Sequence, residues 1–320
     1  MQNFNAKIID KIIGQTSGRN VANRLMEILS ISRESAYRRI SNRIPFSVEE
    51  VTILANRFNF SIDQMIASKP DNNFFLYKDF NTGANPSDAC SNLLISDIEL
   101  MKKLHSSTDM IITATMNRIP FRLLPFQSLF KLEYCHYLYS MGKIPLTAKY
   151  ADIDIPSQIN DLRKDAVACF SRLDNITCII DSMLYSNIIK KIQYYYLLGF
   201  LSGEDLQIIQ RELFDLLEKH ESLLRTGTNN TGLNYTFYYS FFNIESNIIF
   251  IEFDTNSLLQ VWVYPKSSIM TTNSQQVSSI RKRWIDSKIR NSVLITKTVN
   301  IQQIEMLRNV HKEIEELENF

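Results

Sequence analysis

The sequence predicts a mainly α protein with a C-terminal α+β part, and three observations lead to this fold class. Glycine and proline number only eight each among 320 residues, and such a shortage of helix breakers favours long helices over many tight turns. Apolar residues recur at helical spacing up to about residue 225, and the spacing changes to the alternation of strands near residue 233. We therefore expect an N-terminal five-helix domain, a helical middle, and a three-stranded antiparallel meander followed by two helices.

The composition is that of a globular protein, with 45% apolar and 22% charged residues. The chain opens with MQNFNAKIIDKIIGQT, which lacks the basic and apolar regions of a secretory signal. No uninterrupted apolar run reaches the roughly 18 residues that a membrane helix needs. These features predict a soluble, cytoplasmic protein that does not enter a membrane. The four cysteines stand too far apart for a CxxC site, and we expect reduced, buried thiols at Cys90, Cys135, Cys169 and Cys178.

The net charge of +1 conceals an uneven distribution of charge along the chain. Residues 1–70 hold ten basic and six acidic residues, which gives +4, so the other 250 residues carry −3. Seven of the ten basic residues are arginines, and three of these, Arg38, Arg39 and Arg43, fall within six positions. A basic module on a slightly acidic body is typical of a nucleic-acid-binding protein, although a solvated basic helix face gives the same count.

The basic module, residues 1–68, is predicted to contain five short helices. The second and third are joined by the tight turn of residues 30–33, and Ser32 is the expected N-cap of the third. Two helices joined in this way form a helix-turn-helix arrangement. The predicted segments are about 5–14, 19–29 and 32–42, a fourth helix at the capping box Ser47-x-x-Glu50, and a fifth at the capping box Ser61-x-x-Gln64.

The stretch Leu29-Ser-Ile-Ser-Arg-Glu-Ser35 resembles the turn and recognition-helix start of the repressor-like helix-turn-helix family, the fold of phage repressors and their bacterial relatives. The run ISRESAYRRI is similar to the type found in regulators of Bacteroides-like bacteria. The resemblance covers about residues 5–68 and implies a DNA-binding transcriptional regulator. Two positions depart from the family pattern. Ser30 replaces the turn glycine, at a position that often needs a positive φ, and the last apolar anchor of the third helix, Ile40, lies one place later.

The third helix is the expected recognition helix, and its inward face comprises Ala36, Ile40 and the stem of Arg33. In helix-turn-helix proteins this helix lies in the major groove, while other side chains hold the phosphates. Arginine can bridge guanine, glutamate can accept from cytosine, and a ring can touch a thymine methyl. The alternative is that Glu34 and Arg38 form an ordinary surface ion pair. The expected base contacts are Arg33, Glu34, Tyr37 and Arg38, and the expected phosphate contacts are Arg19, Ser32, Arg39 and Arg43.

Residues 69–88 are expected to form a linker, because two prolines, a glycine and several Asn and Asp residues gather there. Residues 89–228 are then predicted to form a helical region that serves regulation or dimerisation. Its apolar stripes predict a core, with a ligand pocket or a dimer face as the alternative. The predicted helices are 92–116, 125–141, 156–172, 174–199 and 202–224.

Residues 229–320 are predicted to form an α+β sensor module. The alternation of apolar and polar residues predicts strands at 234–242, 247–254 and 258–264, joined as an antiparallel meander. Helices are expected at about 273–290 and 300–318, with a short strand at 293–296 between them. The last helix either packs against the sheet or mediates dimerisation.

No pattern of catalytic residues is present, so we expect neither an enzyme nor a cofactor or metal site. The sequence lacks HExxH, phosphate-loop and GxSxG motifs. The scattered histidines, His105, His136, His220 and His311, read as structural or surface residues.

Three hypotheses remain. The leading one is a DNA-binding regulator that reads double-stranded DNA with the helix at 32–42, acts as a homodimer, and is regulated through its C-terminal body, with a small ligand or a peptide as a further partner. A second is an interaction protein whose helix-turn-helix domain binds a protein. A third is an enzyme whose site lies within 234–320.

Overall fold

The structure is a computed structural model of the 320-residue chain. Its contacts divide the chain into two compact units, Met1–Phe74 and Phe75–Phe320. Each unit has its own hydrophobic core. The residues that the structure describes are 4–15, 21–58, 60, 62, 75–79, 85–107, 109–145, 147–253, 256–263 and 268–319.

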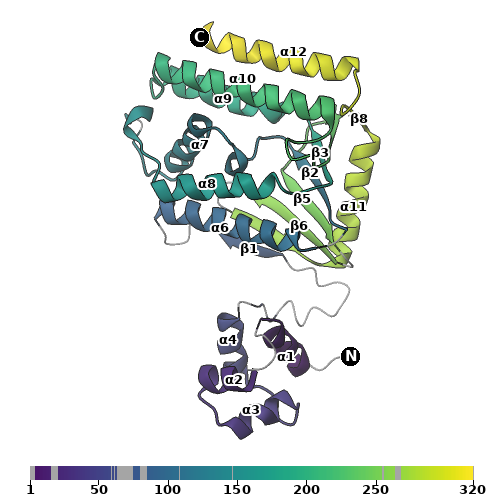
Figure 1. The fold of residues 1–320 in the computed structure, drawn as a ribbon. Coiled ribbons are helices and arrows are strands. Elements are labelled where there is room, and N and C mark those ends of the chain that lie inside the picture. Colours follow the sequence, from purple (N-terminus) through teal and green to yellow (C-terminus); the bar gives the residue numbers. More distant parts are fainter. Residues whose placement is uncertain are drawn as a thin grey trace. The chain divides into compact units, whose positions relative to one another are not determined.

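The first unit contains four described helices: α1 (Phe4–Gln15), α2 (Val21–Leu29), α3 (Arg33–Ile40) and α4 (Val48–Arg57) (Figure 1). They surround a small apolar core, because each amphipathic helix has to bury its apolar stripe against the others. The fifth helix expected from Ser61 falls in a stretch that lies almost entirely outside the described residues. The core side chains are Ile8, Ile12, Val21, Leu25, Ala36, Val51, Leu54 and Phe58.

The second unit is built on one eight-stranded sheet with the strand order β1-β7-β6-β5-β2-β3-β4-β8. The pairs β2–β3 and β3–β4 are parallel, and all the others are antiparallel. The strands are β1 (Leu76–Asp79), β2 (Ile111–Met116), β3 (Ile176–Ile180), β4 (Tyr235–Ser240), β5 (Ile248–Phe253), β6 (Asn256–Val263), β7 (Ser268–Thr272) and β8 (Ser292–Leu294).

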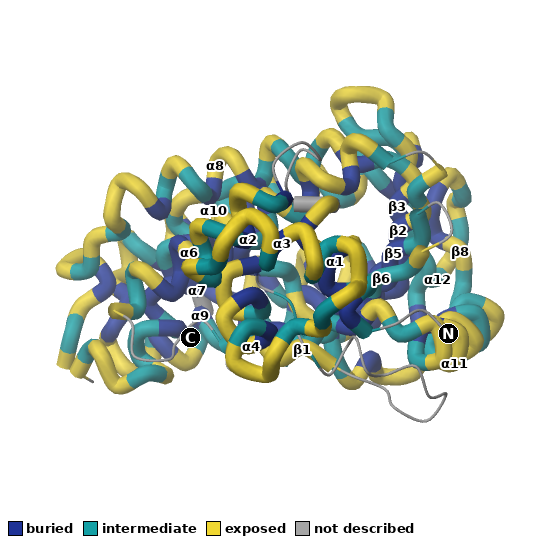
Figure 2. Tube along the Cα trace, turned by 90° about the horizontal axis from the view of Figure 1, so that it is seen from below, coloured by how far each residue is buried: buried dark blue, intermediate teal, exposed yellow. Residues whose placement is uncertain are grey.

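Helices cover both faces of this sheet (Figure 1). Six of them lie over one face and enclose the larger core, and α11 lies over the other face and closes a smaller core around Phe250 and Ile285. Figure 2 shows the central strands β2 and β3 in dark blue, as expected for strands covered on both sides. The helices are α6 (Pro86–His105), α7 (Gln127–Ser140), α8 (Ser157–Phe170), α9 (Met183–Leu197), α10 (Gly203–Thr226), α11 (Gln275–Arg290) and α12 (Ile301–Glu315).

The expected fold class, mainly α with a three-stranded antiparallel meander confined to residues 229–320, is wrong. Strands do form near 234–242, 247–254 and 258–264, but β4 and β5 are not neighbours, because β2 and β3 lie between them in the sheet. β4 pairs in parallel with β3, and β5 pairs in antiparallel fashion with β2. The connection between β4 and β5, residues 241–247, therefore crosses two strands instead of closing a hairpin.

The expectation of an all-helical region over 89–228 is also wrong, because it contains two central strands. The predicted helix 92–116 consists of α6 followed by β2, and the predicted helix 174–199 consists of β3 followed by α9. Both strands are short apolar runs, and a strand buried on both faces shows no alternation that distinguishes it from a buried helical turn. The structure therefore joins 89–228 and 229–320 through one sheet, in one compact unit.

The predicted linker 69–88 contributes a strand to the same sheet. Within it, β1 pairs with β7 in antiparallel fashion, and α6 begins at Pro86 with Asn85 as its N-cap. Proline at the first position of a helix is favourable, because that residue needs no N–H donor. Among the helices that the structure describes, none combines the length and the apolar character that a membrane-spanning segment requires.

Candidate functional site

The turn between α2 and α3 has the conformation that a glycine usually supplies. Ser30 has a φ of +53°, in the left-handed region that L-residues seldom adopt. Two residues later Ser32 caps α3, and its side chain accepts a hydrogen bond from the Ser35 N–H at 3.2 Å. These two residues start α3 directly after α2 and fix the direction in which α3 leaves the turn.

A buried asparagine on α1, Asn5, holds the other end of α3. Its Nδ2 donates to the Arg39 carbonyl at 3.1 Å and to Asn42 Oδ1 at 2.6 Å, and its Oδ1 accepts from the Phe46 N–H at 3.0 Å. Asn42 itself has a φ of +61°. Asn5 thus connects α1 to the residues that terminate α3. This role of Asn5 is not visible in the sequence, because an isolated asparagine on an apolar helix belongs to no motif.

Arg39 was expected to contact phosphates, but the structure commits its guanidinium to the interior of the unit. Its Nε and Nη2 donate to the two carboxylate oxygens of Glu50 at 2.9 and 2.6 Å, and Nη1 donates to Ser35 Oγ at 2.6 Å. Only 13% of the Arg39 side chain is exposed. Because protein acceptors occupy these donors, the Arg39 guanidinium does not belong to the exposed side of α3.

The four expected base-contacting residues share the exposed side of α3. Arg33, Glu34, Tyr37 and Arg38 are all exposed, whereas Ala36 is buried against the core. Arg38 Nη2 forms an ion pair with Glu34 Oε1 at 2.5 Å, and both side chains are at least half exposed. The surface ion pair considered as the alternative is therefore present.

Two further contacts shape this side of α3 and its margin. The Arg33 guanidinium carbon lies 5.8 Å from the centre of the Tyr37 ring, within the range of a cation–π contact. Arg43 and Ser32 are also exposed, while Arg19 lies outside the described residues. We define the α3 surface as Arg33, Glu34, Tyr37, Arg38 and Arg43; it carries three positive charges and one negative charge.

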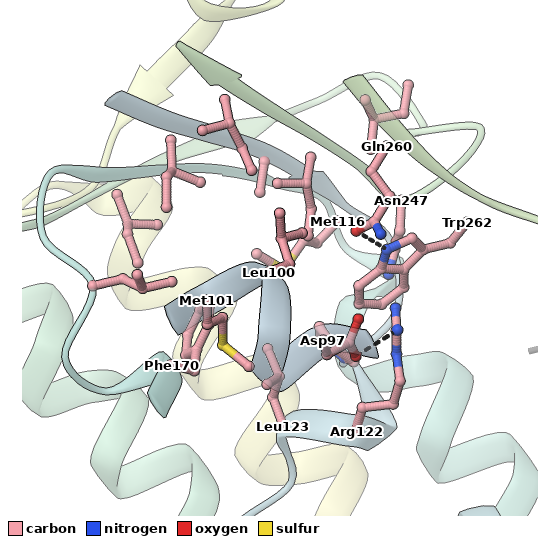
Figure 3. A pocket seen from close by; sticks show the side chains of 18 of the residues that line it. Asp97, Leu100, Met101, Met116, Arg122, Leu123, Phe170, Asn247, Gln260 and Trp262 are labelled. Carbon is pink, nitrogen blue, oxygen red and sulfur yellow. Dashed lines mark hydrogen bonds and ion pairs between the residues drawn. The ribbon is translucent and has the colours of Figure 1, made fainter. Parts of the chain in front are cut away.

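The second unit contains a small chamber beside the sheet, where α6, β2, β5 and β6 meet (Figure 3). Its walls are apolar except at one end, where Arg122 Nη1 donates to Asp97 Oδ2 at 2.5 Å. The Trp262 ring lies over the Arg122 guanidinium at 4.2 Å, and its Nε1 donates to Gln260 Oε1 at 3.3 Å. Burial raises the pKa of Asp97, while Arg122 opposes that shift.

The chamber has a volume of about 60 Å³, which is space for a few water molecules at most. Arg122 is 2% exposed, so the Asp97–Arg122 pair is a buried ion pair whose two charges neutralise each other. We therefore interpret this chamber as a structural feature of the core.

Nothing in the described residues resembles a metal centre or a reactive cysteine site. No group of three or more His, Cys, Asp or Glu side chains in that part of the chain could hold a metal ion. Burial raises the pKa of the thiols of Cys90, Cys135 and Cys178 to about 12, which keeps them protonated at neutral pH. Cys169 is half-buried, and all four cysteines are free.

Comparisons of the chain with models of protein families, with curated proteins and with solved structures found no match.

Proposed function

We propose that the chain is a DNA-binding transcriptional regulator whose α3 enters the major groove of double-stranded DNA. The observation that supports the proposal best is that the side chains of α3 fall into two sets, one packed inside the unit and one exposed. Arg39 and Ala36 hold the helix from inside, and Arg33, Tyr37 and Arg38 project from its opposite side. A helix of this kind presents an exposed, cationic face at a fixed angle, as a groove-reading helix must.

Arg33, Glu34, Tyr37 and Arg38 would read base edges. The Glu34–Arg38 ion pair is compatible with this role, because an exposed pair contributes only about 0–1 kcal/mol and opens at little cost. Arg38 could then bridge guanine O6 and N7 while Glu34 accepts from a cytosine amino group. Arg43 and Ser32, with Arg19, would contact phosphates and set the register.

Two further parts of the proposal concern the whole protein. A homodimer would place two copies of α3 about 34 Å apart, one turn of DNA, which is the spacing of paired half-sites. The unit of residues 75–320 would regulate binding from outside the groove. The second candidate function is recognition of a protein partner by the same helix-turn-helix unit, which the exposed Tyr37 and its neighbours would also permit.

A salt titration separates the two candidates. Fluorescence anisotropy of a labelled random-sequence duplex would be followed between 50 and 200 mM salt. We expect the logarithm of the binding constant to fall linearly with the logarithm of salt concentration, because each phosphate contact releases bound cations. The Arg43→Gln variant should lower the slope by about 1, and the Lys164→Gln control, at an exposed ion pair of the second unit, should not. Absence of binding at 50 mM salt would overturn the proposal in favour of a protein partner.

A further inference from the structure

The second unit contains a larger cavity that the proposed function does not use. It has a volume of about 280 Å³ and lies between α9, α10, the strands β3 and β4, and the segment 116–125. Almost all of its lining is apolar or aromatic, including Phe170, Tyr185 and Phe237. Pockets for small ligands have this character, with few polar groups among many apolar ones.

The first polar group in this cavity is the imidazole of His220 on α10. Its ring lies between two aromatic rings, with centroids 5.9 Å from Tyr185 and 4.8 Å from Phe237. Nδ1 is 3.1 Å from the Tyr185 hydroxyl. Nε2 is buried and has no hydrogen-bond partner among the residues that the structure describes. A buried polar atom left unpaired is unfavourable, so Nε2 is an unused hydrogen-bonding position in an otherwise apolar wall.

Burial lowers the pKa of His220 to about 4, so the ring is neutral at pH 7. In a neutral imidazole one nitrogen donates and the other accepts. A ligand hydroxyl can both donate and accept, and therefore it satisfies Nε2 in either tautomer.

The second polar group is the ammonium of Lys219, the residue before His220. Among the residues that line the cavity, Lys219 is the only lysine, arginine, aspartate or glutamate. It is exposed, which places it at the mouth, and its Nζ lies 4.2 Å from the centre of the Phe126 ring. No carboxylate in the described part of the chain forms an ion pair with it. The mouth therefore carries one uncompensated positive charge.

We infer that this cavity binds a small aromatic carboxylic acid, with its ring inside, its carboxylate at Lys219 and a ring hydroxyl at His220. The volume supports the size, because an apolar cavity of about 150 Å³ accommodates benzene, and this one leaves room for a substituted ring. The stacked rings around His220 favour an aromatic body. Such a ligand would be an effector if the chain is a regulator, but the inference does not depend on DNA binding.

Isothermal titration calorimetry of the full chain without DNA tests the inference. The probes are 4-hydroxyphenylacetate, phenylacetate and 4-ethylphenol. The last is uncharged and keeps the hydroxylated ring, but it has no carboxylate. We expect 4-hydroxyphenylacetate to bind most tightly. Lys219→Gln should weaken binding of the two acids about fivefold and leave binding of 4-ethylphenol unchanged, because it removes a charged but exposed partner. His220→Phe keeps an aromatic ring in place and should reduce the preference for the hydroxylated acid over phenylacetate by about 3–10-fold.

The matched control is Lys131→Gln, because Lys131 also lies over an aromatic ring, Tyr150 at 4.4 Å, but does not line the cavity. It should bind all three probes as the unchanged chain does. Far-ultraviolet circular dichroism would show that each variant is folded. Failure of both acids to bind the folded chain at millimolar concentration would overturn the inference, as would acid binding that Lys219→Gln does not weaken. Since DNA is absent from these measurements, neither result bears on the DNA-binding proposal.

Discussion

Arg39 and Glu50 form a bidentate ion pair that joins α3 to α4, with Nε–Oε2 and Nη2–Oε1 distances of 2.9 and 2.6 Å. The side chains are 13% and 15% exposed. Glu50 Oε2 also accepts the Ser47 N–H at 3.0 Å, as the reciprocal half of the α4 capping box. One carboxylate therefore fixes the start of α4 and the inner side of α3 together.

Replacing Glu50 with alanine should destabilise the first unit more than any surface change on the same helix. Removal of one partner from a mostly buried ion pair leaves the other charge uncompensated and costs about 3 kcal/mol. Both tryptophans, Trp262 and Trp284, lie in the second unit, so hydrogen exchange of the α3 and α4 amides is the suitable measurement. Protection should fall about 100-fold. The control is Glu49→Ala, an exposed neighbour, and equal effects of the two variants would contradict the role of the pair.

Arg38→Ala should weaken specific DNA binding by about 1–3 kcal/mol, because it removes a base-edge contact. The side chain is about half exposed, and its one ion-pair partner among the described residues is the exposed Glu34, so the fold should be unaffected. Anisotropy titration against a selected binding sequence measures the loss. Lys164→Ala changes the total charge equally in the second unit and serves as the control. Unchanged affinity for Arg38→Ala would refute the base-contact role.

Ser30→Gly should stabilise the first unit by about 0.5 kcal/mol. Glycine relieves the left-handed strain at φ +53°, and the gain is partly offset by the greater freedom of glycine in the unfolded chain. Ser30→Val should instead destabilise the unit, because a β-branched side chain tolerates this conformation least. Hydrogen exchange of the α2 and α3 amides measures both the gain expected for glycine and the loss expected for valine. If Ser30→Gly destabilised the unit, the contacts of the serine side chain would contribute more to stability than the relief of backbone strain.

Arg122→Met should lower the free energy of unfolding of the second unit by about 3 kcal/mol, because it leaves Asp97 buried without its counter-charge. The double variant Arg122→Met with Asp97→Leu should recover part of this loss, since no charge then remains in the chamber. Urea unfolding followed by tryptophan fluorescence reports on this unit directly, because Trp262 lies against Arg122. A double variant less stable than the single one would argue against the ion-pair explanation.

Acidification should destabilise the second unit through its buried histidines. Burial lowers the pKa of both His136 and His220 to about 4, below the ordinary value of 6.5. Between these values the unfolded chain binds protons that the folded chain does not, so stability falls as the pH decreases from about 6.5 to about 4. For His220 the loss between pH 7 and pH 5 is about 2 kcal/mol. Urea titrations should show a smaller pH dependence for His220→Phe, whereas the exposed His105→Gln should keep the full dependence.

Local features of the α3 surface and of the turn before it follow from the sequence, because their causes are local. Ser32 and Ser47 cap helices through hydrogen bonds within three residues, and the spacing of Arg33, Tyr37 and Arg38 places them on one side of a helix. The positive φ at Ser30 follows in the same way from its position in the turn. Arg39 could not be assigned from spacing, because its partner Glu50 is eleven residues away.

Local sequence patterns are enough to locate most helices, their caps and the uneven charge of the two parts of the chain. The order of the strands, the strand conformation of Ile111–Met116 and Ile176–Ile180, and the shared cavity of Lys219, His220 and Phe170 become visible only in the folded chain. Capping and helical spacing act over a few residues and are visible along the chain. The pairing of β2 with β5, about 140 residues apart in sequence, depends on burial from both faces of a complete sheet, which no local pattern records.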